Sequence, residues 1–486
     1  MIRKLRFWNV KISPTQGWIK SLLLAVLCML LFWGLVIWGV VYLASTESDA
    51  DLKSRVVSIK SNLSIPLYFW VPGTRYGSGF VINADKGLVL TTRRVVREGV
   101  HQSIELTFSH KKVLPAKLVY YDLRHNISIL KYDPSKLELR MPPLPDGIQT
   151  KDVDLDELLQ IYHASWSKGI RVFEQSTISK NEFTSVSRFL RQTNHMMIHA
   201  AGRRVNTGAP VFTDSQKWAG MVTYEDDEEG KLYVLPYDVL RRFARFDVDA
   251  PPSRGELFMD TSRISLKGVK RYLGLKDTSY TQEQLLEVDT ASEKSCLKVG
   301  DVLLEVRDSE PSGSWKKIHL SNAFELERIV DDNVGKDITL KVLRKEHIQD
   351  ISCMPQDLEK QKTTSFLRWM GSTLYMTPDY QRMAYDMPEK FNVILSQALS
   401  GSPWGAVGSF DKLFIHKIQG RSFKNIEALA QLTQSIQTDQ GMNVLGRDIN
   451  ESALKDMIFY LNADVERFET VSYDWSHDTH VWVKHE

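Results

Sequence analysis

Cysteine is scarce in this chain of 486 residues, which contains only Cys28, Cys296 and Cys353 and no C-x-x-C pair. This scarcity excludes a disulfide-rich scaffold and the usual cysteine zinc module, and it leaves open whether Cys296 and Cys353 pair. A large charge of one sign is also missing, because 62 basic and 60 acidic residues give a net charge of +2. A general nucleic-acid binder needs a basic face, so we expect no nucleic acid as a partner.

Charge is absent altogether from residues 21–44, which form an apolar run of 24 residues. About 20 such residues suffice to cross a bilayer as a helix. The run is longer than the apolar region of a signal peptide, and no small-x-small cleavage pattern ends it. We therefore predict one uncleaved N-terminal transmembrane helix over 21–44.

The two flanks of this run differ in charge. Residues 1–20 form a basic tail without an acidic residue, whereas Glu47, Asp49 and Asp51 follow the run. The positive flank of a membrane helix stays in the cytoplasm. The expectation is a single-pass, membrane-embedded protein of the cytoplasmic (inner) membrane. Its N-terminus would lie in the cytoplasm and, in a Gram-negative cell, its bulk in the periplasm.

Short apolar runs separated by turn residues predominate from 63 to 249, after a polar linker over 45–62. Many short strands with few helices between them are typical of a sandwich or a barrel. The pair Pro251-Pro252 then interrupts regular structure.

Two further blocks, 256–357 and 363–486, each mix strands with one helix. Their similar order of segments indicates one module used twice. The second block ends in a stretch over 459–486 that is rich in aromatic residues and His. Whether this stretch packs on its own domain or on a partner stays open.

Four motifs follow one another in the first region. They are the G-S-G turn within Tyr76–Ile82, the run T-T-R-R-V-V over Thr91–Val96, the run D-L-R-H-N-I-S-I-L over Asp122–Leu130, and His199–Pro210, which ends in V-N-T-G-A-P. In this order they resemble the trypsin-like domain of the HtrA/Deg protease family, where these segments carry the catalytic His, Asp and Ser. The resemblance implies a trypsin-like double β-barrel over 63–249.

Each catalytic position of that family is changed here: Arg94 replaces the His, Asn126 the Asp and Thr207 the Ser, and Val205 replaces the glycine of the oxyanion hole. A guanidinium stays protonated and cannot act as a general base. An amide cannot stabilise an imidazolium, and a β-branched residue resists the backbone angles that glycine permits. We therefore expect a pseudoprotease with no catalytic residue.

Two alternatives stay open at this site. His195 and His199 share strand parity and can approach it. They would then serve an atypical serine- or threonine-type endopeptidase, or a metal-binding module, although we predict no metal and no cofactor. His125 precedes Asn126, and adjacent side chains of a strand point to opposite faces, so we expect it to face away.

The two C-terminal blocks resemble the PDZ domains that follow the protease in this family. In the first block, residues 271–275 are similar to the family's carboxylate-binding loop, and Leu297–Leu304 is similar to its strand entry. The resemblance implies capture of protein or peptide C-termini by Arg271, Tyr272, Leu273, Gly274 and Leu275. In the second block, residues 369–374 stand in the place of that loop.

The expected fold class is thus mostly β, with one N-terminal transmembrane helix, a trypsin-like double β-barrel and two α+β PDZ-like domains. The resemblance also implies a homotrimer formed through the N-terminal segment of the protease domain. Tyr68, Phe69 and Trp70 lie about there, and they fit either this contact or the core. The favoured function is a catalytically inactive, membrane-anchored HtrA/Deg-like protein. It would bind peptides or partner proteins as a scaffold, sensor or regulator of envelope protein quality control.

Overall fold

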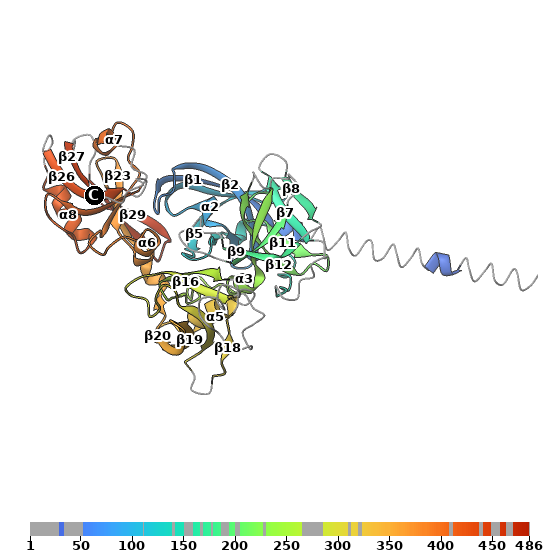
Figure 1. Cartoon of the computed structure of the whole chain (residues 1–486). Coiled ribbons are helices and arrows are strands. Elements are labelled where there is room, and N and C mark those ends of the chain that lie inside the picture. The colour runs from blue at the N-terminus through green and yellow to red at the C-terminus, as the bar shows by residue number, and fades with distance from the viewer. Residues whose placement is uncertain are drawn as a thin grey trace, which may run out of the picture. The chain divides into compact units, whose positions relative to one another are not determined.

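The computed structural model (Figure 1) divides the chain into two units, Met1–Ser54 and Arg55–Glu486, which we describe separately. The structure describes residues 29–33, 52–109, 111–138, 141–149, 159–165, 169–175, 178–185, 194–199, 205–226, 230–264, 285–309, 313–318, 323–407, 412–436, 441–448, 457–462 and 470–485.

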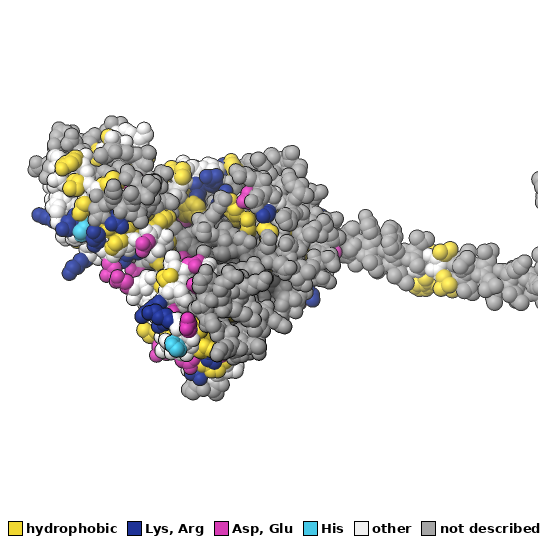
Figure 2. Space-filling view, in the orientation of Figure 1, with side chains coloured by type: hydrophobic (Ala, Val, Ile, Leu, Met, Phe, Trp, Pro, Cys, Tyr) yellow, Lys and Arg dark blue, Asp and Glu magenta, His cyan; other side chains and the backbone are white. Residues whose placement is uncertain are grey.

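The N-terminal unit corrects the predicted transmembrane helix. Within the run 21–44, the described helix covers residues 29–33, whose apolar side chains are exposed (Figure 2). In the part of the chain that the structure describes, no helix has the length and apolar character needed to cross a membrane. The rest of the run lies outside the described residues.

A closed barrel with strand order β1-β2-β3-β6-β5-β4 opens the second unit (Figure 1). β1 pairs antiparallel with both β2 and β4, which closes the barrel. Alternating burial, as along β4, turns one face of each strand into the interior. The strands are β1 (Val56–Pro66), β2 (Gly73–Asn83), β3 (Leu88–Thr91), β4 (Gly99–Thr107), β5 (Val113–Tyr121) and β6 (Ser128–Tyr132), with the short helices α2 (Arg93–Val96) and η1 (Pro134–Lys136).

A seven-stranded sheet with the order β8-β7-β11-β12-β13-β10-β9 follows. Phe80 of the barrel packs on Phe212 and Trp218 of this sheet at ring distances of 5.6 and 5.2 Å, so the two halves share a core. Its elements are β7 (Leu159–Ser165), β8 (Gly169–Gln175), β9 (Ile178–Ser185), β10 (Asn194–His199), β11 (Pro210–Thr213), β12 (Trp218–Asp226), β13 (Lys231–Pro236) and the helix α3 (Tyr237–Ala244). This supports a mostly β, trypsin-like fold.

The first C-terminal block forms a sheet of order β15-β16-β17-β19-β20, with β18 beside β17. Leu326, Ile329 and Val330 of helix α5 are buried in its core. A disulfide joins Cys296 and Cys353, whose Cα atoms lie 5.5 Å apart, which answers the question that the sequence left open. The elements are β14 (Gly255–Glu256), β15 (Met259–Ile264), β16 (Leu285–Ala291), β17 (Val302–Arg307), β18 (Lys316–Lys317), α5 (Ala323–Asp332), β19 (Ile338–Arg344), β20 (His347–Cys353) and β21 (Gln356–Asp357).

The second C-terminal block forms an eight-stranded sheet of order β27-β26-β25-β24-β23-β22-β28-β29. Asn425 caps helix α8 by accepting the Ala428 N–H at 3.0 Å. The described part of the stretch 459–486 joins this sheet through β28 and β29. The elements are η6 (Leu358–Gln361), β22 (Ser365–Trp369), β23 (Ser372–Met376), α6 (Asp379–Ala384), β24 (Val393–Ser396), α7 (Pro403–Val407), β25 (Lys412–Ile418), α8 (Ile426–Gln434), β26 (Gly441–Asp448), β27 (Met457–Asn462), β28 (Val471–Ser476) and β29 (Val481–His485). The predicted domain bounds themselves stay a prediction.

The aromatic segment expected at a trimer contact packs within the chain. The Tyr68 ring lies 5.8 Å from that of Tyr375 and 6.3 Å from that of Tyr380. The Phe69 ring lies 5.8 Å from that of Tyr385. These aromatic residues therefore join the barrel to the second C-terminal block.

Candidate functional site at the degenerate triad

Arg94, at the position of the general base, lies on helix α2 directly after β3. Its side chain is exposed, and the guanidinium carbon stands 5.1 Å from the centre of the Tyr224 ring. Its backbone N–H donates to Asn126 Oδ1 at 3.1 Å. A cation over an aromatic face is worth about 0.5–1 kcal/mol at an exposed site. The side chain that replaces the base is therefore held over strand β12.

Asn126, at the position of the orienting acid, is buried in a loop that Asp122 shapes. Asp122 Oδ1 accepts the N–H groups of Arg124 at 2.8 Å and His125 at 2.6 Å. The Asn126 amide then donates from Nδ2 to the Thr223 carbonyl at 2.9 Å, while Oδ1 accepts from Arg94. Both ends of the amide are thus satisfied by backbone groups. A carboxylate in this place would set an acceptor against the Thr223 carbonyl.

Thr207, at the position of the nucleophile, lies with Gly208 against the backbone of Ser78. Its carbonyl accepts the Ser78 N–H at 2.9 Å. Gly208 follows with a φ of 88°, and a Cβ there would stand 2.0 Å from the Ser78 carbonyl oxygen, so only glycine fits. The Thr207 hydroxyl lies 3.4 Å from the Thr92 hydroxyl. A second hydroxyl does not have the basicity to activate the first for attack.

Val205, at the position of the oxyanion glycine, is buried at the edge of the second sheet's core. Its N–H donates to Glu225 Oε1 at 3.1 Å. The next residue is held as well, because Asn206 Nδ2 donates to the Ala164 carbonyl at 2.6 Å. A carboxylate therefore occupies the donor that an oxyanion needs. Two like charges about 4 Å apart repel by roughly 4 kcal/mol at an effective dielectric constant of 20.

Two histidines, His195 and His199, were considered as substitutes for the missing base. His195 is buried in β10, and the side chain of His199 lies outside the described residues. Across the described ranges, no cluster of three His, Cys, Asp or Glu side chains is arranged to hold a metal ion.

His125 sits in a bend and not in the strand that the sequence suggested, and it is buried. Its Nε2 lies 3.0 Å from Glu327 Oε2 on α5, and its Nδ1 lies 2.6 Å from Arg254 Nη2 and 3.6 Å from Asp122 Oδ1. Burial disfavours the charged imidazole, but the carboxylates of Glu327 and Asp122 outweigh this effect and raise the pKa of His125. The imidazole thus belongs to a contact with the first C-terminal block.

Arg254, in the segment after Pro251-Pro252, is the centre of that contact. Its Nε lies 2.7 Å from Asp122 Oδ2, and its Nη1 lies 2.5 Å from Asp331 Oδ2 on α5. All three side chains are buried. Burial alone would raise the pKa of Asp122, but Arg254 holds it well below its ordinary value. We call Asp122, His125, Arg254, Glu327 and Asp331 the buried charge network; it fixes the Asn126 loop to α5.

The predicted carboxylate-binding residues Arg271, Tyr272, Leu273, Gly274 and Leu275 lie outside the described residues. In the second block, residues 369–374 form a tight hairpin turn, with φ values of 48° at Met370 and 80° at Gly371. Strand β23, which follows this turn, is paired with β22 on one side and with β24 on the other. This segment therefore offers no open strand edge to a peptide.

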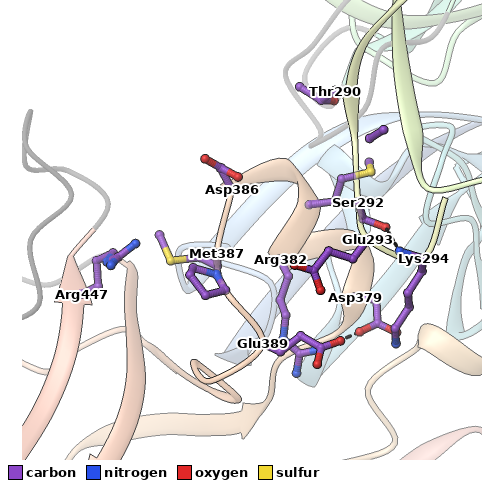
Figure 3. Close-up of a pocket in the computed structure, with 13 residues that line it drawn as sticks. Thr290, Ser292, Glu293, Lys294, Asp379, Arg382, Asp386, Met387, Glu389 and Arg447 are labelled. Carbon is purple, nitrogen blue, oxygen red and sulfur yellow. Dashed lines mark hydrogen bonds and ion pairs between the residues drawn. The ribbon is translucent and has the colours of Figure 1, made fainter. Parts of the chain in front are cut away.

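A cleft of about 520 Å³ lies between residues 290–294 of the first block and the region of α6 in the second (Figure 3). Lys294 Nζ pairs with Asp379 Oδ2 at 2.6 Å, and Arg382 Nη1 donates to Asp379 Oδ1 at 2.6 Å. With Glu293, Asp386, Glu389 and Arg447, the lining carries four acidic and three basic side chains, so the cleft has a mixed charge.

Comparison with known proteins agrees with this geometry. Residues 77–221 match the trypsin-like peptidase domain family. A Schizosaccharomyces pombe protein named PDZ domain-containing protein C23G3.12c is 27% identical over 71% of this chain and 35% of its own length. The pro-apoptotic serine protease NMA111 of Ajellomyces capsulatus is 24% identical over 74% of this chain and 35% of its own length.

This chain is similar to the trypsin-like serine proteases. It spans about a third of the length of these curated relatives. Among solved structures, the HtrA-type protease AlgW with a tripeptide is similar with a TM-score of 0.46 and 16% identity, over 63% of this chain and 95% of that chain. A serine endoprotease from Yersinia pestis gives a TM-score of 0.40 at 16% identity, over 63% of this chain and 96% of that chain.

The predicted localisation is corrected as well. It placed the HtrA-like chain in a bacterial inner membrane, on the strength of the transmembrane helix over 21–44. No such helix is found in the described part of the chain, and the curated relatives named above are fungal proteins. The hydropathy argument for an anchor and a periplasmic ectodomain therefore no longer stands.

Proposed function

We propose that this HtrA-like chain is catalytically inactive and binds peptides or partner proteins, as a scaffold, sensor or regulator of protein quality control. The observation that carries the proposal is the hydrogen bond from the Val205 N–H to Glu225 Oε1. Acyl transfer needs that N–H for the developing oxyanion and needs a base beside the nucleophile. Here the Glu225 carboxylate accepts that N–H, and Arg94 stands in place of the base.

The test of inactivity uses the purified full chain with a covalent serine-hydrolase probe and a fluorogenic peptide library. We expect no labelling and no cleavage above that of the matched Thr207→Ala variant. Labelling or cleavage that Thr207→Ala abolishes would instead establish an atypical threonine-type endopeptidase.

The binding part of the proposal concerns residues 271–275 of the first C-terminal block. Successive backbone N–H groups around Gly274 are suited to a terminal carboxylate. Peptides with apolar C-termini should bind with modest affinity, because ordering a flexible peptide offsets much of the contact energy. Amidating the terminus should weaken this binding; equal affinity of acid and amide peptides across a library would count against it. A homotrimer is not part of the proposal, because Tyr68 and Phe69 pack within the chain.

A further inference from the structure

The C-terminal hairpin, formed by β28, β29 and the turn between them, lies against strand β22 of the second block. β28 pairs antiparallel with β22 from Ser365 opposite Asp474 to Arg368 opposite Val471. β29 then pairs with β28 and ends the sheet in the described part of the chain. Without the hairpin, β22 would expose a row of backbone N–H and C=O groups.

Burial on the two sides of this contact is unequal. Phe366 of β22 is fully buried under two rings of the hairpin: Tyr473 stacks on it at 4.8 Å and Trp482 meets it edge-on at 4.9 Å. No residue of β28 or β29 is itself buried. Segments that bury little apolar surface open locally before the rest of a fold. The hairpin therefore covers Phe366, a residue of the hydrophobic core, with side chains that are themselves only partly buried, and it also meets the barrel where Lys117 Nζ donates to the Thr479 carbonyl at 3.4 Å.

We propose that the edge of β22 is a binding site for an extended, aromatic-containing segment of another protein, and that the C-terminal hairpin is its internal, displaceable occupant. The backbone of β22 would supply affinity by strand addition, and the Phe366 ring would select an aromatic side chain at the place of Tyr473. This surface goes beyond the proposed function, because it uses neither residues 271–275 nor the degenerate triad. Strand β23 is paired on both sides, with β22 and β24. We therefore place the added strand along β22, on the side where β28 now pairs.

The test uses the full chain and a labelled synthetic peptide of residues 470–485 as the probe. In the variant Tyr473→Ala/Trp482→Ala, the internal occupant loses both ring contacts with Phe366. An aromatic pair is worth about 0.5–1.5 kcal/mol, so the hairpin should open about 10- to 100-fold more readily. We expect fluorescence polarisation to show at least tenfold tighter peptide binding by this variant than by the unmodified chain. A peptide carrying the same two alanines should lose that binding.

The matched control is Val481→Thr/Val483→Thr, which changes two exposed side chains of the same hairpin and should bind like the unmodified chain. Equal affinity of the loosened variant and the unmodified chain would overturn the proposal. Dimerisation of the loosened variant without peptide would also overturn it, since a second copy would then be the occupant.

A measurement on the unmodified chain guards against a variant that fails to fold. By hydrogen exchange, the β28 amides should exchange at least tenfold faster than those of β23 and β24. Equal protection of all three strands would make the hairpin a fixed part of the domain and overturn the proposal.

Discussion

Replacing Glu225 should decide whether a rebuilt triad works. Restoring the triad alone, with Arg94→His, Asn126→Asp and Thr207→Ser, leaves the Val205 N–H bound to the Glu225 carboxylate at 3.1 Å. An oxyanion forming beside that carboxylate meets a repulsion of roughly 4 kcal/mol at 4 Å and an effective dielectric constant of 20. This alone is a factor of about 10³ in rate. We expect little or no activity from the triple variant.

Adding Glu225→Ala frees the N–H and removes the charge. One oxyanion donor is usually worth about 10²–10³ in kcat, and the charge repulsion adds a factor of about 10³, so the quadruple variant should exceed the triple one by more than about 10³. Glu225→Gln is the matched control, because it removes the charge but can keep the N–H engaged, and it should give an intermediate rate. Val205→Gly, added last, releases the backbone restraint and should raise the rate further.

The assay is kcat/KM on a fluorogenic peptide, with a thermal melt for every variant. Asn126→Asp sets a carboxylate against the Thr223 carbonyl, so the restored proteins should lose about 1–3 kcal/mol of stability. Full activity of the triple variant with Glu225 intact would refute the argument. An unchanged rate on adding Glu225→Ala to a folded triple variant would refute it equally.

Three further predictions concern stability. Arg254→Met removes the guanidinium that lies between the buried carboxylates of Asp122 and Asp331 and should lower the unfolding free energy by about 3–5 kcal/mol in denaturant titrations. Arg242 lies 2.9 Å from the exposed Asp332 carboxylate and 3.4 Å from Asp331, so Arg242→Met should cost less; equal losses would contradict the network's role. Burial alone would raise the pKa of Glu327, but contact with His125 lowers this pKa to about 2. Glu327 therefore stabilises the fold above about pH 4.5 and loses this contribution as the pH falls toward 2. His125, whose pKa is raised, contributes fully below about pH 6.5 and loses its contribution as the pH rises through its folded-state pKa. Melts from pH 2 to 9 should show both losses, and Glu327→Gln and His125→Gln should each remove one. Reducing the Cys296–Cys353 disulfide, which spans 57 residues, should cost about 4 kcal/mol by loop entropy, and the double serine variant should not respond to reductant.

Features that depend on a few neighbouring residues could be predicted from the sequence. The V-N-T-G-A-P run carries the resemblance at the nucleophile position, and there Gly208 adopts a positive φ against the Ser78 carbonyl. Asn425 caps α8 through a residue only three positions away, which is also a local contact. Local geometry leaves a local signature in the sequence.

Features that join distant segments could not be predicted. Glu225 follows Val205 by 20 residues, and Glu327 follows His125 by 202, so no spacing rule connects them. His125 was expected to face away from the degenerate site, and its partners are Arg254 and Glu327. It lies in a bend that Asp122 shapes, where strand parity does not apply, so the sequence could not name these partners. The transmembrane helix was predicted from the length of the uncharged run and from the charges on its two flanks, whereas no helix in the described part of the chain is long and apolar enough to cross a membrane.

One short loop shows why losing the catalytic acid need not loosen this fold. Asp122 folds the loop by accepting two of its N–H groups. From that turn, Asn126 points to Arg94 and Thr223 at the degenerate site, while His125 points to Arg254 and Glu327. The first direction tolerates a neutral amide because backbone groups satisfy both of its ends. The second direction depends on charge, because unpaired buried ions are costly. The loop therefore keeps its conformation through the buried charge network, and this conformation does not require a charged residue at position 126.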